Sequence, residues 1–136
     1  MEKVLQPRQY FIFDYGFLPR TLGEDGDPPD VIILSSNKLI SNLIVEVVPI
    51  SLMKMIDEGE GDDKIIAIVK DDFYWSKNVV NKRILENKHK EIEEWFKVYK
   101  GINGTLLEIN GFRSKKEALE IIGSSREEYN RKFNRN

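Results

Sequence analysis

Apolar positions in the first half of this chain come in short runs, and turn residues separate one run from the next. The runs are rich in β-branched residues, a pattern typical of β-strands. The predicted strands cover Ile32–Leu34, Leu43–Val48, Leu52–Met55 and Ile65–Val69. The run Leu43–Val48 is too apolar for a strand with one open face, so we expect it to be largely buried.

From Lys82 to Tyr99 the period changes, and apolar residues fall on one stripe with charged residues opposite. This pattern predicts an amphipathic helix whose aromatic residues belong to the core rather than to a cofactor site. The stripe consists of Leu85, Ile92, Trp95, Phe96 and Tyr99.

A further strand is expected at Thr105–Ile109, after the glycine-containing segment 101–104. Ser114 followed three residues later by Glu117 is a capping-box sequence, which predicts the start of a last helix. The order of elements therefore predicts one α+β domain over residues 1–136, a small closed β-barrel flanked by two α-helices.

Composition narrows the function classes. The chain has 136 residues, with 21 Lys and Arg against 23 Asp and Glu, so its net charge is −2. A nucleic-acid binder is usually basic, so this charge argues against that class. There is no Cys, which excludes disulfides, thiol catalysis and thiolate metal sites. The one histidine, His89, lies in a polar run and is expected to be an exposed helical residue, so zinc is a poor candidate.

The first residues are too polar for a secretory signal, and no apolar run approaches membrane-spanning length. We therefore expect a cytoplasmic protein with no membrane partner.

Two acidic turns carry the candidate chemistry. Asp25, Asp27 and Asp30 crowd a Gly/Pro-containing turn, and a second cluster occupies residues 57–63, directly before Lys64. Either cluster alone could be a solvated turn. Carboxylates this close repel one another, however, and a hard cation that binds their oxygens removes the repulsion. Together the two turns suggest the wall of one polynuclear Mg²⁺ or Mn²⁺ site.

Neither cluster is a calcium-binding EF-hand loop. Counted from Asp25, the sixth position is Asp30, where that loop requires Gly. Counted from Asp57, the twelfth position is Ile68, where a bidentate Glu is needed.

Spaced motifs surround these turns: Tyr15-Gly16-Phe17, the 25–30 turn, Lys54-Met55-Ile56-Asp57-Glu58, Asp62-Asp63-Lys64 and Tyr99-Lys100. Their order resembles the soluble inorganic pyrophosphatases of family I, from about Lys3 to the C-terminal helix. The resemblance implies an OB-like barrel, hydrolysis of inorganic pyrophosphate to two phosphates at a Mg²⁺–carboxylate site, and a homo-oligomer, commonly a hexamer.

The resemblance also implies residue roles. Asp25, Asp30, Asp57 and Asp62 would hold metal and should converge within a few ångströms. Asp27 would accept a proton from the nucleophilic water, and Tyr15 would orient that side of the site. The residues that would donate to phosphate oxygens are Lys3, Lys64, Tyr99 and Lys100. Two of these have plainer explanations, since Lys64 could form a local ion pair and Tyr99 could simply end the buried stripe of its helix.

The chain departs from the family pattern in three places. Met1 aligns well inside the family's usual chain, so the first strands of the barrel, with a substrate-binding Lys and an acidic residue, are expected to be missing. Lys3 stands where the family has Arg, which keeps the charge but loses the bidentate fork. Pro29 replaces an aliphatic residue and could reshape the turn. An exposed edge at Val4–Phe13 would favour self-association.

Three functions remain open on the sequence. The first is an active pyrophosphatase, and the second is a degenerate relative that binds metal or phosphate, or acts as an interaction module, without useful turnover. The third is an OB-type oligonucleotide binder, which the net charge disfavours. Retention of all the central aspartates favours the first.

Overall fold

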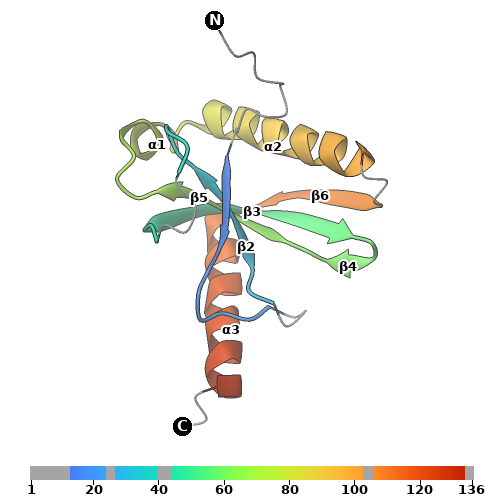
Figure 1. The fold of residues 1–136 in the computed structure, drawn as a ribbon. Coiled ribbons are helices and arrows are strands. Elements are labelled where there is room, and N and C mark those ends of the chain that lie inside the picture. Colours follow the sequence, from blue (N-terminus) through green and yellow to red (C-terminus); the bar gives the residue numbers. More distant parts are fainter. Residues whose placement is uncertain (1–12, 24–26, 40–43, 103–105, 134–136) are drawn as a thin grey trace, which may run out of the picture.

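The computed structural model describes residues 13–23, 27–39, 44–102 and 106–133. These residues form six strands and three helices (Figure 1). In chain order the elements are β1 (Asp14–Phe17), β2 (Asp30–Leu34), β3 (Val47–Asp57), β4 (Glu60–Gly61), β5 (Lys64–Val69), α1 (Phe73–Asn78), α2 (Lys82–Ile102), β6 (Leu107–Arg113) and α3 (Lys115–Phe133).

The strands form one mixed sheet in the order β1-β2-β5-β3-β4, and β6 pairs with β3. Only the β2–β5 pair is parallel among these described strands, and it aligns Asp30 with Lys64. This is the expected α+β architecture of the OB-like type.

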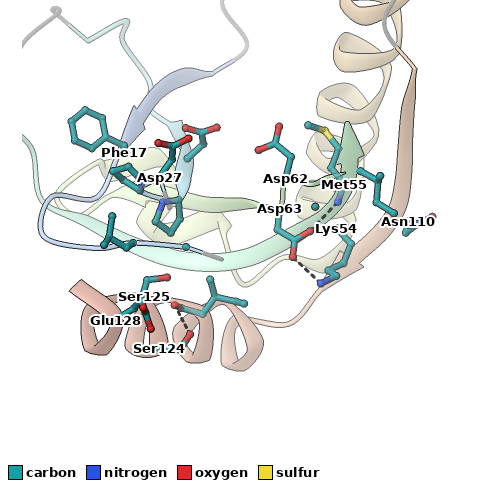
Figure 2. Close-up of a pocket in the computed structure, with 18 residues that line it drawn as sticks. Phe17, Asp27, Lys54, Met55, Asp62, Asp63, Asn110, Ser124, Ser125 and Glu128 are labelled. Carbon is teal, nitrogen blue, oxygen red and sulfur yellow. Dashed lines mark hydrogen bonds and ion pairs between the residues drawn. The ribbon is translucent and has the colours of Figure 1, made fainter. Parts of the chain in front are cut away.

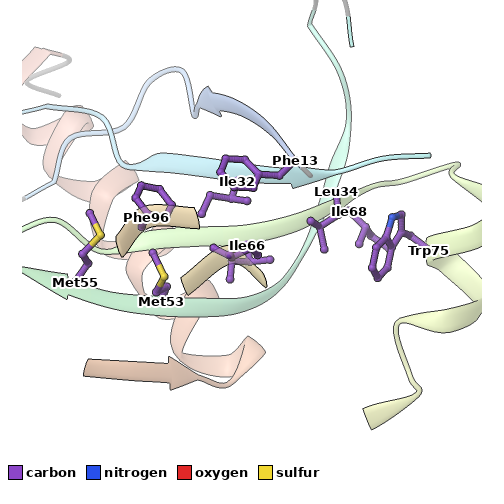
Figure 3. Close-up of a cluster of buried hydrophobic side chains, with 10 residues drawn as sticks. Phe13, Ile32, Leu34, Met53, Met55, Ile66, Ile68, Trp75 and Phe96 are labelled. Carbon is purple, nitrogen blue, oxygen red and sulfur yellow. The ribbon is translucent and has the colours of Figure 1, made fainter. Parts of the chain in front are cut away.

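Apolar side chains fill both sides of the sheet, which explains the continuous apolar runs in β2 and β5. Ile32 and Ile66 pack toward α2, where they meet Ile92 and Phe96. Figure 3 shows this layer, with Phe96 of α2 and Trp75 of α1 meeting side chains from the strands. On the other side, the cluster around α3 consists of Val31, Ile33, Leu52, Ile65, Ala67, Ala118 and Ile122. Figure 1 shows α2 and α3 on opposite sides of the sheet.

The predicted buried strand at Leu43–Val48 is wrong. Residue 43 lies outside the described residues, residues 44–46 are not in a strand, and the Ile44 side chain is 94% exposed. The strand begins at Val47 and continues as one element to Asp57, so it also contains the separately predicted run Leu52–Met55. Its register against β5 shifts between Pro49 and Ser51. Such an irregularity lets a strand contain proline, which has no N–H to donate to the ladder.

Both long helices predicted from the sequence are confirmed. The amphipathic stripe becomes α2, with Ile92 and Phe96 buried. The Ser114 hydroxyl accepts a hydrogen bond from the Glu117 amide at 3.3 Å, and α3 begins at the next residue after this cap. The strand expected at Thr105–Ile109 is shifted, because β6 covers Leu107–Arg113 and Thr105 lies outside the described residues.

The sequence patterns do not predict one helix, and they predict one exposure wrongly. Helix α1 is short, and the signal that could have found it is Asp72, whose side chain caps the helix by accepting from the Trp75 amide at 3.0 Å. The expected exposure of His89 is wrong. Its ring is partly buried, stacks on Phe112 with centroids 4.0 Å apart, and lies 2.8 Å from the Ser51 hydroxyl. The sequence shows a polar neighbourhood around His89, but the β3 and β6 side chains that cover it come from distant parts of the chain.

Candidate functional site

The two acidic turns meet at the start of two neighbouring strands. Asp30 opens β2 and Lys64 opens β5, and the parallel register places these residues side by side. The Lys64 ammonium lies 2.7 Å from Asp30 Oδ2 and 2.9 Å from Asp62 Oδ1. Lys64 is only 3% exposed. One buried cation therefore joins carboxylates from both turns.

Electrostatics keeps this lysine charged. Burial disfavours the ammonium, but the Tyr15 phenol and the Asp30 and Asp62 carboxylates raise the pKa of Lys64 above its usual range. Burial raises the pKa of Asp62, against the hydrogen bond from Lys64, and the charges of Asp30 and Asp57 add to the rise. The carboxylates of this cluster therefore carry more negative charge than the one ammonium of Lys64 neutralises.

Tyr15 adds a hydroxyl to the cluster from β1. Its OH donates to Asp30 Oδ2 at 3.3 Å, and the Lys64 Nζ atom lies 5.4 Å from the ring centroid. Burial raises the pKa of Tyr15 to about 12, although Lys64 acts in the opposite direction. The residue as a whole is half exposed, but its hydroxyl is turned toward Asp30. The phenol therefore stays protonated and acts as a donor at neutral pH.

A cleft of about 1180 Å³ opens over this cluster. Asp27, Asp30 and Asp62 line it together with Lys54 and Asp63. Figure 2 shows that Ser124, Ser125 and Glu128 of α3 form the wall opposite these strands. The cleft is therefore large enough for a small polyanion and offers oxygen ligands from several elements.

Contacts with α3 hold the loop that leads to the first acidic turn. The Leu22 amide donates to the Ser125 carbonyl at 2.9 Å, and the Gly23 amide donates to the Asp27 carbonyl at 2.7 Å. Thr21 is buried, and its hydroxyl donates to the Leu18 carbonyl at 2.6 Å. Sequence reasoning did not assign Thr21 or Ser125 to the site, because a local hydroxyl bond at Thr21 and a backbone carbonyl contact at Ser125 are not indicated by residue type.

Some predicted site residues lie outside the cluster or outside the description. Lys3 and Asp25 are not among the described residues, and Lys100 lies in α2 with its side chain undescribed. Tyr99 is 47% exposed and stacks on Trp95, with centroids 4.9 Å apart and planes 11° apart. The expected roles of these four residues stay predictions.

Asp57 ends β3, and its Oδ1 atom is buried. Its charge is close enough to raise the pKa of Asp62. Across residues 13–23, 27–39, 44–102 and 106–133, no three acidic or imidazole side chains already surround a cation position. The convergence of all four predicted ligands therefore stays a prediction, although Asp30 and Asp62 do meet.

The fold and the cleft together define a class: a small α+β domain with an oxygen-only, carboxylate-rich site. The sequence profile of the family described as inorganic pyrophosphatase matches residues 1–130. The chain is 36% identical over 125 residues to the inorganic pyrophosphatase of Thermus thermophilus, covering 90% of this chain and 71% of that protein. It is 36% identical over 129 residues to a soluble inorganic pyrophosphatase of rice (Oryza sativa subsp. indica), covering 95% of this chain and 60% of the relative.

A crystal structure of the Thermus thermophilus pyrophosphatase superposes with a TM-score of 0.82 at 35% identity, covering 95% of this chain and 76% of that one. The chain belongs to the inorganic pyrophosphatase family, hydrolases that act on diphosphate. These relatives do not favour the non-catalytic alternative. In the described residues, every helix is too short or too polar to cross a lipid bilayer.

Members of this family use divalent metal cofactors. The donor chemistry of the cleft fits such an ion, since the candidate ligands are carboxylate oxygens, which suit hard cations. The excess negative charge around Lys64 fits it as well. Burial is the main cause of the raised pKa of Asp62, and a bound cation would relieve the repulsion from Asp30 and Asp57 that adds to it.

Proposed function

We propose that this chain hydrolyses inorganic pyrophosphate to two phosphates in the acidic cleft, with Mg²⁺ or Mn²⁺ as the cofactor. The observation that carries the proposal is the junction of Asp30 and Asp62 on the buried Lys64 ammonium. That junction combines anionic oxygens for hard cations with a fixed positive charge for phosphate oxygens.

The proposed metal ligands are Asp25, Asp30, Asp57 and Asp62. When bound there, divalent cations would neutralise phosphate oxygens and lower the pKa of coordinated water. Carboxylates released from Lys64 by a cation would leave its ammonium available to a phosphate oxygen. In the metal-free site burial disfavours the ammonium, and Tyr15, Asp30 and Asp62 raise the pKa of Lys64; a bound phosphate oxygen would take over as the anionic partner that keeps it charged.

Asp27 is proposed as the group that accepts a proton from the attacking water. It lines the cleft beside Asp30, and its backbone is tied to Gly23 in the loop braced by α3. The Tyr15 hydroxyl would orient Asp30 by its hydrogen bond. Lys3, Tyr99 and Lys100 are proposed as additional donors to the substrate.

A phosphate-release assay tests the proposal. The parent should release two phosphates per pyrophosphate when Mg²⁺ is present, and Asp27→Asn should be slower by about 10²–10⁴, the usual cost of losing a positioned general base. Asp27→Asn keeps the shape of the side chain, so its Mg²⁺ affinity by calorimetry should stay within a few-fold of the parent.

The matched control is Asp71→Asn, the same chemical change at an exposed residue beyond the far end of β5. It should hydrolyse pyrophosphate at the parent rate. Equal rates for Asp27→Asn and the parent would contradict the role of Asp27, and a parent without turnover would contradict the proposed function.

Self-association is proposed on the predicted sheet edge and on the family resemblance. The predicted edge at Val4–Phe13 falls almost wholly on residues outside the description. The hexamer and the cytoplasmic location stay predictions.

A further inference from the structure

The pairing of β3 changes partner immediately beside the site. Up to Met53, which aligns with Lys64, β3 pairs with β5. From Ile56, which aligns with Gly61, it pairs with β4. Lys54 and Met55 lie between these ladders, opposite Asp62 and Asp63, and here the regular pairing is interrupted.

The side chain of Asp63 supplies a hydrogen-bond acceptor where the strand pairing is interrupted. The Asp62 amide donates to the Met55 carbonyl at 2.8 Å, so one backbone group of Met55 is paired in the ordinary way. The Met55 amide, which points to the same edge of the strand, donates instead to Asp63 Oδ1 at 3.1 Å. Met55 is 1% exposed, so its amide would be costly to leave unpaired.

The other carboxylate oxygen of Asp63 lies 2.7 Å from the Lys54 ammonium. Figure 2 shows both interactions as dashed lines, with Asp62 directed away from Asp63. The Lys54 side chain is 41% exposed, so solvent weakens this ion pair. The bond to the Met55 amide is therefore the stronger constraint.

We propose that Asp63 is a positioning residue: its carboxylate replaces the missing ladder partner of Met55 and thereby fixes Asp62 and Lys64 in the site. Asp62 is directed away from Asp63 and contacts Lys64, so anchoring Asp63 on one side of this segment holds its two neighbours on the other. The inference rests on the proposed function, because it assigns Asp63 to the geometry of the same cation and phosphate site.

The test compares the full chain with three variants, each of which removes a different set of the Asp63 interactions. Asp63→Ala removes both interactions, Asp63→Asn keeps an oxygen that can accept from the Met55 amide, and Lys54→Met removes only the ion pair. Mg²⁺ affinity is measured by calorimetry without substrate, and kcat and KM by phosphate release. Asp63→Ala should bind Mg²⁺ at least about tenfold more weakly and lose about 10- to 100-fold in kcat/KM, the scale expected for a misplaced site.

Asp63→Asn and Lys54→Met should both keep the Mg²⁺ affinity of the parent within about threefold. The control is Asp71→Ala, the same truncation at an exposed residue after β5, which should change neither quantity. A purely structural role would lower the melting temperature of Asp63→Ala but leave the Mg²⁺ affinity of the folded protein unchanged. If Asp63→Ala does not fold, Asp63→Ser takes its place, because its hydroxyl is one bond too short to reach the Met55 amide.

Parent-like Mg²⁺ affinity and kcat/KM in the truncated variant would overturn the inference, as would a loss in Asp63→Asn equal to that in Asp63→Ala. A parent that binds Mg²⁺ without hydrolysing pyrophosphate would refute the proposed function alone, and the Mg²⁺ measurements would still decide the role of Asp63. A parent that binds no Mg²⁺ has no site to position and would overturn both.

Discussion

Lys64 shows how one residue can organise a site made of groups far apart in sequence. Its ammonium is buried and contacts carboxylates that belong to two different turns. A charge in this position is stable only while it is paired, because a buried unpaired charge is expensive. The same argument applies to the carboxylates, which repel one another once the ammonium is gone.

Replacing Lys64 by Met should therefore destabilise the metal-free protein. Breaking a fully buried ion pair costs about 3–5 kcal/mol, but Asp30 and Asp62 are about one-third exposed, so we expect a loss of about 1–3 kcal/mol at pH 7. Urea unfolding measures it, and added Mg²⁺ should recover part of the loss. Lys70→Met is the control, since the Lys70 ammonium forms an exposed 3.7 Å pair with Glu46. Equal stability of the two variants would contradict the structural role of Lys64.

At the scale of elements, the β3–β4 hairpin sets the direction of the second acidic turn. Its two turn residues, Glu58 and Gly59, have φ values of 55° and 83°. Positive φ at both positions is what a two-residue turn of type I′ requires, because its twist matches that of the flanking strands. Glycine adopts this conformation readily, whereas residues with a side chain are strained by it.

Gly59→Ala should lower the free energy of unfolding by about 1 kcal/mol through this strain alone. A Cβ atom at Gly59 meets nothing within 4 Å, so no steric clash contributes. Gly61→Ala is a matched control, since its Cβ also meets nothing within 4 Å and no positive φ occurs there. Chemical denaturation should show Gly61→Ala equal to the parent or slightly more stable. Equal losses in both variants would exclude the backbone explanation.

At the scale of the whole molecule, the packing of α2 on the sheet makes stability depend on pH. His89 of α2 contacts Ser51 of β3 and Phe112 of β6. Burial lowers the pKa of His89 to about 4, although the charge of Glu86 acts in the opposite direction. In the unfolded chain the pKa is about 6.5, so between these values the unfolded state binds a proton that the folded state does not.

This contribution to stability is complete above about pH 6.5 and is lost as the pH falls toward 4. From pH 7 to pH 5 the parent should lose about 1 kcal/mol from His89, after allowance for its partial exposure. Urea unfolding at both pH values measures the loss, and His89→Gln should lose correspondingly less. Identical losses in the parent and the variant would show that His89 does not link α2 packing to pH.

Local patterns in the sequence determined the elements whose signal lies within a few residues. The β-branched runs became β2 and β5, the apolar stripe became α2, and Ser114 capped α3. The spaced motifs also identified the family, because several short patterns in a fixed order are far more specific than one.

The tertiary structure decided the burial and the pairing of side chains, because both depend on which distant residues come into contact. Ile44 looked buried because its neighbours are apolar, but its side chain is exposed and none of the described helices or strands covers it, whereas Phe112 and Ser51 cover His89 in a polar run. The convergence of Asp30 and Asp62 on Lys64 needed the parallel register of β2 and β5, and the anchor at Asp63 needed the change of partner along β3. Burial and pairing arise from contacts between segments far apart in the chain, and local sequence patterns do not encode those contacts.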